Sequence, residues 1–129
     1  MKGLLLDTNA YSAFKRGQPE ALEILSHAPF IGLDSIALGE LLGGFAGGMK
    51  EAWNRQELEQ FCSSRRVQRI LVDEQTAEHY ARISVDLKRK GLPIPTNDMW
   101  IAASAFRHDL ALFTYDGHFQ YISSTSPVS

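Results

Sequence analysis

The feature that most constrains this chain is the apolar run Leu4-Leu5-Leu6, which ends abruptly at Asp7. A helix-like pattern follows through Phe14, so this segment predicts a buried strand, a carboxylate at its C-terminal end and then a helix. In open α/β sheets, ligands bind just outside the carboxyl ends of the strands, where an acid is well placed for chemistry. The alternative is structural, because Asp7 or Thr8 can serve simply as the N-cap of the helix.

The same order of strand and helix recurs along the chain. Further strand candidates are Phe30–Leu33, Val67–Val72 and Leu110–Phe113, and the helix candidates cover residues 10–16, 20–27, 36–45, 49–66, 75–90 and 99–108. This alternation favours an α/β fold, a single-domain open parallel sheet flanked by helices on both faces. The length of 129 residues also favours one domain. We predict that it spans residues 1–122, with Tyr121-Ile122 as a candidate edge strand and residues 123–129 as a flexible C-terminal tail.

Composition removes several classes of protein. The hydrophobic share of 44% and the charged share of 22% are typical of a globular protein. The net charge of −2 means that attraction to a polyanion would have to come from local patches or from metal ions. The single cysteine, Cys62, excludes an internal disulfide framework and favours a cytoplasmic location. No apolar run resembles a signal peptide or approaches the roughly 18 residues of a membrane span.

Three more acids occupy positions of the same kind. Glu40 lies in the nearly uncharged helical segment SIALGELLGGF, Asp98 opens a helix after the rigid connector GLPIP, and Asp116 follows the last strand candidate. Each has a structural alternative: a solvated helix face for Glu40, a cap for Asp98 and an Asp-Gly turn for Asp116. Asp73 and Glu74 also follow a strand, but we interpret them as partners of a helix dipole.

The strand ends and the starts of the crossover helices share one edge of such a sheet, so the four acids can converge. Crowded carboxylates repel one another unless a cation neutralises them, which is the physical argument for a metal site. A set of oxygen ligands without cysteine or clustered histidine favours Mg²⁺ or Mn²⁺ over zinc. Such an ion would suit hydrolysis of a phosphodiester bond.

These segments also resemble a known family. The motifs LLLDTN, SIALGELLGG, GLPIPTNDMWIAA and LFTYDGHF are similar, in this order, to those of the PIN domain, and most closely to the VapC-type toxin ribonucleases of type II toxin–antitoxin pairs. The resemblance implies a metal-dependent endoribonuclease with RNA as substrate, a homodimer, and a small antitoxin whose tail blocks the site. It implies that the catalytic residues, which bind Mg²⁺ or Mn²⁺, are Asp7, Glu40, Asp98 and Asp116, and that the supporting residues are Thr8, Asn9 and Thr114.

The chain also departs from the family pattern. Tyr115 stands where relatives often carry a polar or basic residue, and the tail ISSTSPVS lacks the apolar final strand that many relatives show. We expect structural roles for Trp100 and His118. The predicted RNA contacts, made through charge alone, are Lys15, Arg16, Lys88, Arg89 and Lys90.

Two other functions remain open. A phosphatase of the haloacid-dehalogenase type would need a second acid two positions after Asp7, where this chain has Asn9, which cannot transfer a proton at neutral pH. The second is a catalytically silent PIN-like module that only binds a partner or nucleic acid. Metal affinity would separate that module from a nuclease.

Overall fold

The computed structural model describes residues 2–117, 119, 122 and 127–128 and contains six helices and a five-stranded sheet in those residues. The strands are β1 Leu4–Leu6, β2 Ile31–Asp34, β3 Val67–Ile70, β4 Ala111–Phe113 and β5 Pro127–Val128. The helices are α1 Thr8–Lys15, α2 Pro19–His27, α3 Ser35–Ala46, α4 Glu51–Cys62, α5 Glu74–Lys90 and α6 Thr96–Arg107. The predicted alternation of strands and helices is confirmed.

The sheet is parallel throughout, in the order β3-β2-β1-β4-β5. Strand β1 lies at the centre, with Leu4 opposite Ile31 on one side and Ala111 on the other. The chain therefore builds outward from β1 to β3 and then returns to place β4 on the other side of β1. The chain reverses its direction of building between β1 and β4. The carboxyl ends of these two neighbouring strands therefore mark the topological switch point, where open α/β sheets usually bind their ligands.

The central strand explains why helices cover both faces of the sheet. Successive side chains of a strand point to opposite faces. Leu4 and Leu6 pack into one core cluster with α1, α2, α3 and α4, whereas Leu5 packs into a second cluster with α5 and α6. All three leucines are fully buried, which is why this strand is a continuous apolar run in the sequence.

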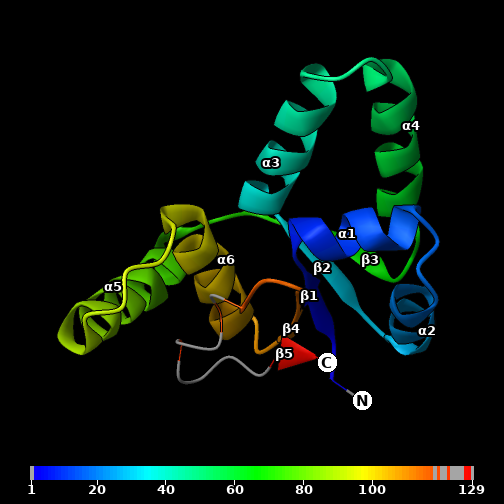
Figure 1. Ribbon diagram of the computed structural model, residues 1–129. Helices are drawn as coiled ribbons and strands as arrows, with labels where there is room; N and C mark the ends of the chain where they lie inside the picture. Colours follow the sequence, from blue (N-terminus) through cyan, green and yellow to red (C-terminus); the bar gives the residue numbers. More distant parts are fainter. Residues whose placement is uncertain (1, 118, 120–121, 123–126, 129) are drawn as a thin grey trace.

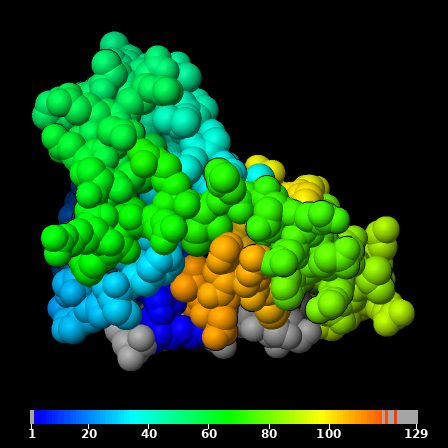
Figure 2. Space-filling view, turned by 180° about the vertical axis from the view of Figure 1, so that it is seen from behind, coloured from blue at the N-terminus to red at the C-terminus, as the bar shows by residue number. Residues whose placement is uncertain are grey.

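Two helices extend beyond the layers of the sheet. Figure 1 shows α3 rising away from the sheet and α4 returning beside it, and the space-filling view shows the same pair standing clear of the rest of the molecule (Figure 2). The first part of α3 packs on the sheet, where Ala37 and Leu41 are buried. Glu40 is carried by this packed part, close to the carboxyl ends of the strands.

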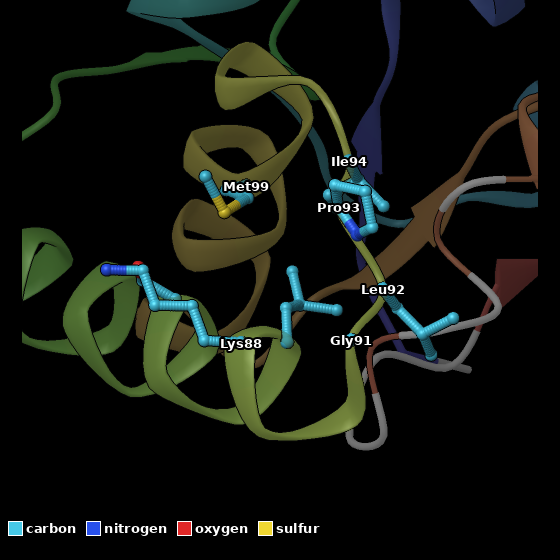
Figure 3. A pocket seen from close by; sticks show the side chains of 8 residues that line it. Lys88, Gly91, Leu92, Pro93, Ile94 and Met99 are labelled. Carbon is cyan, nitrogen blue, oxygen red and sulfur yellow. The ribbon is translucent and has the colours of Figure 1, made fainter.

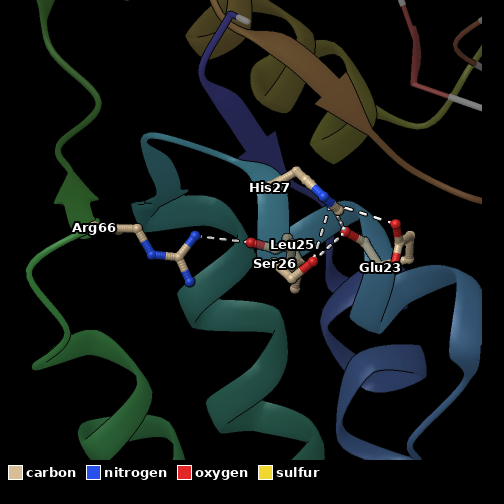
Figure 4. Close-up of polar contacts among 5 residues, drawn as sticks. All are labelled: Glu23, Leu25, Ser26, His27 and Arg66. Atoms are coloured by element: carbon tan, nitrogen blue, oxygen red, sulfur yellow. Dashed lines mark hydrogen bonds and ion pairs between the residues drawn. The ribbon is translucent and has the colours of Figure 1, made fainter.

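An arginine that precedes β3 binds the C-terminal end of α2. Arg66 donates from Nη1 to the backbone carbonyl oxygen of Leu25 at 2.8 Å (Figure 4). The same Nη1 donates to the backbone carbonyl oxygen of Ala28 at 2.6 Å. The guanidinium thus satisfies carbonyl groups at the end of α2, where a positive charge is also favourable. The helix predicted over 49–66 ends earlier, at Cys62. Arg66 instead contacts the end of α2 through its side chain, and its backbone carbonyl accepts a hydrogen bond from Ile31, at the start of β2.

The end of the chain differs from the expected edge strand. Ile122 is buried in a bend, and the last strand lies later, where Pro127 is paired with Leu112 of β4. Tyr121 and His118 lie outside the described residues, as do residues 123–126 of the predicted tail. Among the described residues, no helix is both long and apolar enough to cross a bilayer.

Candidate acidic site

The carboxyl end of β1 delivers Asp7 into a buried position, with 4% of the residue exposed. One carboxylate oxygen accepts a hydrogen bond from the Thr8 backbone N–H at 2.8 Å, so Asp7 does cap α1. The other oxygen accepts a hydrogen bond from the Thr114 hydroxyl at 2.6 Å. The capping alternative and the site prediction are therefore compatible, because Asp7 holds a helix and a second strand end together.

Glu40 projects from α3 toward the start of two other helices. Its Oε1 accepts a hydrogen bond from the Thr8 hydroxyl at 2.7 Å, and its Oε2 accepts one from the Asn97 side-chain amide at 3.3 Å. The residue is half-buried, so it is not the fully solvated side chain of the structural alternative. The contact with Asn97 was missed by the sequence reasoning, although Asn97 lies beside Asp98 in the motif that was singled out.

Asp98 lies in the first turn of α6 and is buried, with 9% of the residue exposed. The N-cap of α6 is Pro95, which offers no side-chain capping bond, so capping does not account for the position of Asp98. The charge of Asp98 raises the pKa of Asp7, as does the charge of Glu40. Both acids therefore lie near enough to Asp7 to affect its ionisation.

Asp116 belongs to the loop after β4, on the other side of the switch point. Its backbone N–H donates to the Thr114 hydroxyl oxygen at 2.9 Å, and the same hydroxyl donates to Asp7. The neighbouring Tyr115 N–H donates to the side-chain oxygen of Asn9 at 3.0 Å. Thr114 and Asn9 therefore bind the loop that carries Asp116 to the segment that follows β1.

The electrostatics of the site are concentrated on Asp7. Burial raises its pKa from the ordinary 3.8 to about 6, and the charges of Asp98 and Glu40 add to this increase. The hydrogen bonds from Thr114 and Thr8 lower the pKa and offset the rise only in part. A buried carboxylate that is costly to ionise, facing further acids, is a group that a cation would stabilise.

The polar groups of the site are of the kind that a hard divalent cation prefers. The donors are carboxylate, amide and hydroxyl oxygens, which suit Mg²⁺ or Mn²⁺. However, no group of three or more histidine, cysteine, aspartate or glutamate side chains among the described residues, which include all four acids, is arranged to hold a metal ion. The chemistry of the donors nevertheless fits such an ion.

The predicted RNA contacts fall into two groups at opposite sides of the molecule, one at the end of α1 and one at the end of α5 (Figure 1). Lys15 pairs with Glu57 at 3.4 Å, and Lys90 pairs with Asp86 at 2.8 Å. Arg16 lies close enough to Tyr115 to influence its phenol. The structure does not gather these cations into one surface.

An apolar pocket of about 330 Å³ lies between the end of α5 and the start of α6 (Figure 3). Lys88 is among its lining residues, which are otherwise mainly apolar: Leu87, Leu92, Pro93, Ile94 and Met99. None of the four acids lines it.

Trp100 contacts the ring of Tyr80 at a centroid distance of 4.1 Å, in agreement with the expected structural role.

Comparison with known proteins gives a consistent result. The PIN domain matches residues 4–124. Ribonuclease VapC4 of Mycobacterium tuberculosis is 34% identical over 89 residues, 68% of each chain, and ribonuclease VapC2 of Rickettsia felis is 31% identical over 114 residues, 85% of this chain and 84% of that protein. Among solved structures, VapBC2 of Rickettsia felis bound to a DNA fragment from its promoter superposes with a TM-score of 0.84 and 28% identity, over 97% of this chain and 96% of that one.

Proposed function

Since the chain belongs to the PIN-domain family and the VapC ribonucleases are its relatives, we propose that it is a metal-dependent endoribonuclease, the toxin of a toxin–antitoxin pair. The observation that carries the proposal is the network around Asp7, in which Thr8 reaches Glu40 and Thr114 links Asp7 to the Asp116 loop. This network connects β1, α3 and the end of β4 at the switch point of the sheet. The substrate is RNA, cleaved at a phosphodiester bond.

Asp7, Glu40, Asp98 and Asp116 would hold Mg²⁺ or Mn²⁺. When bound, such an ion neutralises the acids, contacts a phosphate oxygen and lowers the pKa of a coordinated water. Thr8 and Thr114 orient the carboxylates through hydroxyl hydrogen bonds of 2.7 and 2.6 Å, the usual task of groups behind a ligand. Asn9 holds the backbone of Tyr115, and so keeps the next residue, Asp116, at the site.

The partners are proposed on the same basis. Solved relatives include VapBC toxin–antitoxin complexes, so we assign to this chain a cognate antitoxin that restrains it. We also propose that it forms a homodimer and acts in the cytoplasm, where its RNA substrate is found. An antitoxin that covers the carboxyl edge of the sheet would block access of RNA to the acids.

The test is cleavage of total cellular RNA by the purified chain without antitoxin, with Mg²⁺, Mn²⁺ or a chelator, followed by mapping of the new ends. Asp98→Asn retains the size of the side chain but removes a charge from the site. Asp73→Asn is the matched control, since it removes an acid from the start of another helix and keeps a residue that caps well.

We expect discrete cuts that require the metal, disappear in Asp98→Asn and persist in Asp73→Asn. Undiminished cleavage by Asp98→Asn would refute the assignment of the four acids. Folded protein that binds Mn²⁺ but cuts no RNA would refute the ribonuclease activity under these conditions. Failure to bind Mn²⁺ at all would favour the silent PIN-like module.

A further inference from the structure

A fifth acid, Asp34, lies behind the acidic site and takes no part in the proposed chemistry. It is the last residue of β2 and is fully buried. One carboxylate oxygen accepts a hydrogen bond from the Ala37 backbone N–H at 2.8 Å, which caps α3. The other accepts a hydrogen bond from the hydroxyl of Ser104, a buried residue of α6, at 2.7 Å.

Capping alone does not explain this arrangement. Asp73 caps α5 with the same kind of bond, at 2.9 Å, but its side chain is exposed. Its other hydrogen bond comes from the hydroxyl of the same residue, Thr76, and so reaches no second helix. A buried carboxylate is costly unless it is fully hydrogen-bonded, and burial raises the pKa of Asp34. The distinctive feature of Asp34 is therefore its bond to a second helix.

The two helices that Asp34 joins are the ones that carry Glu40 and Asp98. At the open edge of the site, α3 and α6 are connected by the bond from Asn97 to Glu40. In the interior they are connected a second time, by Ser104 and Asp34, two turns further along α6. Two connections at different depths fix both the separation and the relative angle of α3 and α6. A single connection would fix the separation at one point and let the helices rotate about it.

We propose that Asp34 is a positioning residue of the acidic site, which through Ser104 fixes α3 against α6 and so sets the separation of Glu40 and Asp98. The inference rests on the proposed function, because a separation matters only if both acids bind one metal ion. The role depends on the geometry of the hydrogen bonds and not on the charge. An asparagine at position 34 can accept from Ala37 and donate to Ser104, and therefore preserves both connections.

The test measures Mn²⁺ affinity and the separate values of kcat and KM for Asp34→Ala, Ser104→Ala and Asp34→Asn, at a temperature where circular dichroism shows each variant to be folded. Asp73→Ala is the matched control, because it removes the cap of a helix that carries none of the four acids. We expect the two disconnecting variants to bind Mn²⁺ roughly 10-fold more weakly, as when other groups behind a ligand are lost. Asp34→Asn and Asp73→Ala should retain the wild-type affinity.

A second measurement does not depend on the metal. The side-chain amide of Asn97 gives its own NMR signals, which report its contact with Glu40. We expect these signals to shift in Ser104→Ala and Asp34→Ala but not in Asp73→Ala. If wild-type protein binds no Mn²⁺, the proposed function fails and the Asn97 signals alone decide the structural part of the inference.

Two results would overturn the proposal. The first is a folded Ser104→Ala variant whose Mn²⁺ affinity and Asn97 signals are those of the wild type, since Asp34 would then only stabilise the fold. The second is an Asp34→Asn variant as impaired as Asp34→Ala, because the charge and not the connection would then be required.

Discussion

The first and third strands of this sheet end alike in the sequence and differently in the molecule. Asp7 follows β1 and caps α1, and Asp73 follows β3 and caps α5. Yet Asp7 is buried with its pKa raised to about 6, whereas Asp73 is exposed, and the hydrogen bonds from Thr76 lower its pKa. The same local signal, an acid between a strand and a helix, thus gives a carboxylate that is costly to ionise in one place and one that ionises readily in the other.

The position of the strand in the sheet explains the difference. β1 lies between β2 and β4, so Asp7 opens onto the switch point and faces acids from α3 and α6. β3 is an edge strand, and Asp73 is bonded within its own helix and paired with the cation Arg107 at 3.8 Å. An aspartate at the end of a parallel strand is therefore a candidate for function when the strand is central and other acids converge there.

The largest expected effect is the loss of cleavage in Asp7→Asn. Replacing groups that merely support a metal ligand costs roughly 10–100-fold in affinity or activity, and we expect loss of the ligand itself to cost at least as much. Asp73→Asn should leave the rate unchanged. Rates are compared on a single mapped RNA site at saturating Mg²⁺, and equal losses in the two variants would remove the distinction between the strand ends.

The same substitution should stabilise the protein when no metal is present. Between the ordinary pKa of 3.8 and about 6, folded Asp7 keeps a proton that the unfolded chain has lost. The free energy of unfolding therefore falls as pH rises through this window, by about 3 kcal/mol for a pKa change of this size, and stays low above it. Asn97 and the threonines cannot remove this penalty, but neutralising Asp7 can.

We accordingly expect Asp7→Asn to raise Tm by several degrees at pH 7 in chelator. Part of the gain is lost, because the side-chain NH2 group of the asparagine cannot accept the hydrogen bond that the Thr114 hydroxyl donates to Asp7. The stability difference between variant and wild type should shrink as pH falls from about 6 toward 4. Thermal unfolding at a series of pH values measures it. A variant less stable than wild type throughout this range would contradict the raised pKa of Asp7.

The sequence was sufficient to predict much of this arrangement. The apolar run at Leu4–Leu6 and the repeated order of strand and helix predicted the parallel sheet, because a strand covered on both faces must be apolar at every position. Thr8 and Thr114 do contact two of the four acids, and their supporting role stays a prediction. The prediction of the sheet follows from short-range patterns, whereas the role of the two threonines was implied by the family resemblance.

The remaining features depend on distances between segments far apart in the chain. The hydrogen bond that distinguishes Asp34 from an ordinary helix cap comes from Ser104, which is 70 residues away in the chain. Arg66 was assigned to the end of a helix it does not belong to, because the carbonyl groups it satisfies are those of α2. Hydrogen-bond partners on other elements leave no periodic signal in the sequence.

A smaller effect, on cleavage or on stability alone, is expected from removing the threonine hydroxyl that donates to each aspartate, Thr114 to Asp7 and Thr76 to Asp73. Thr114→Val keeps the shape of the side chain but removes the donor to Asp7 and the acceptor for the Asp116 N–H, and should lower the cleavage rate roughly 10-fold. Thr76→Val removes the equivalent donor to Asp73, at 2.8 Å, and should affect stability alone. Thr114→Ser, which retains the hydroxyl, should cleave at nearly the wild-type rate. A Thr114→Val enzyme with unchanged kcat would show that Asp7 needs no orientation.

The smallest effect on function is expected for Asp73→Ala, which should lower stability but leave cleavage and Mn²⁺ affinity unchanged. The variant loses the capping bond to Thr76 and a long ion pair with Arg107 that is partly exposed and so contributes little. Because the pKa of Asp73 is lowered in the folded protein, its contribution is present above the ordinary 3.8 and disappears as pH falls through the folded value. We therefore expect Tm to drop by a few degrees at pH 7, by less at pH 3, and cleavage and Mn²⁺ affinity to stay at wild-type values. If cleavage fell together with Tm, an acid at the end of an edge strand would be as important as one at the centre, and position in the sheet would no longer separate the two.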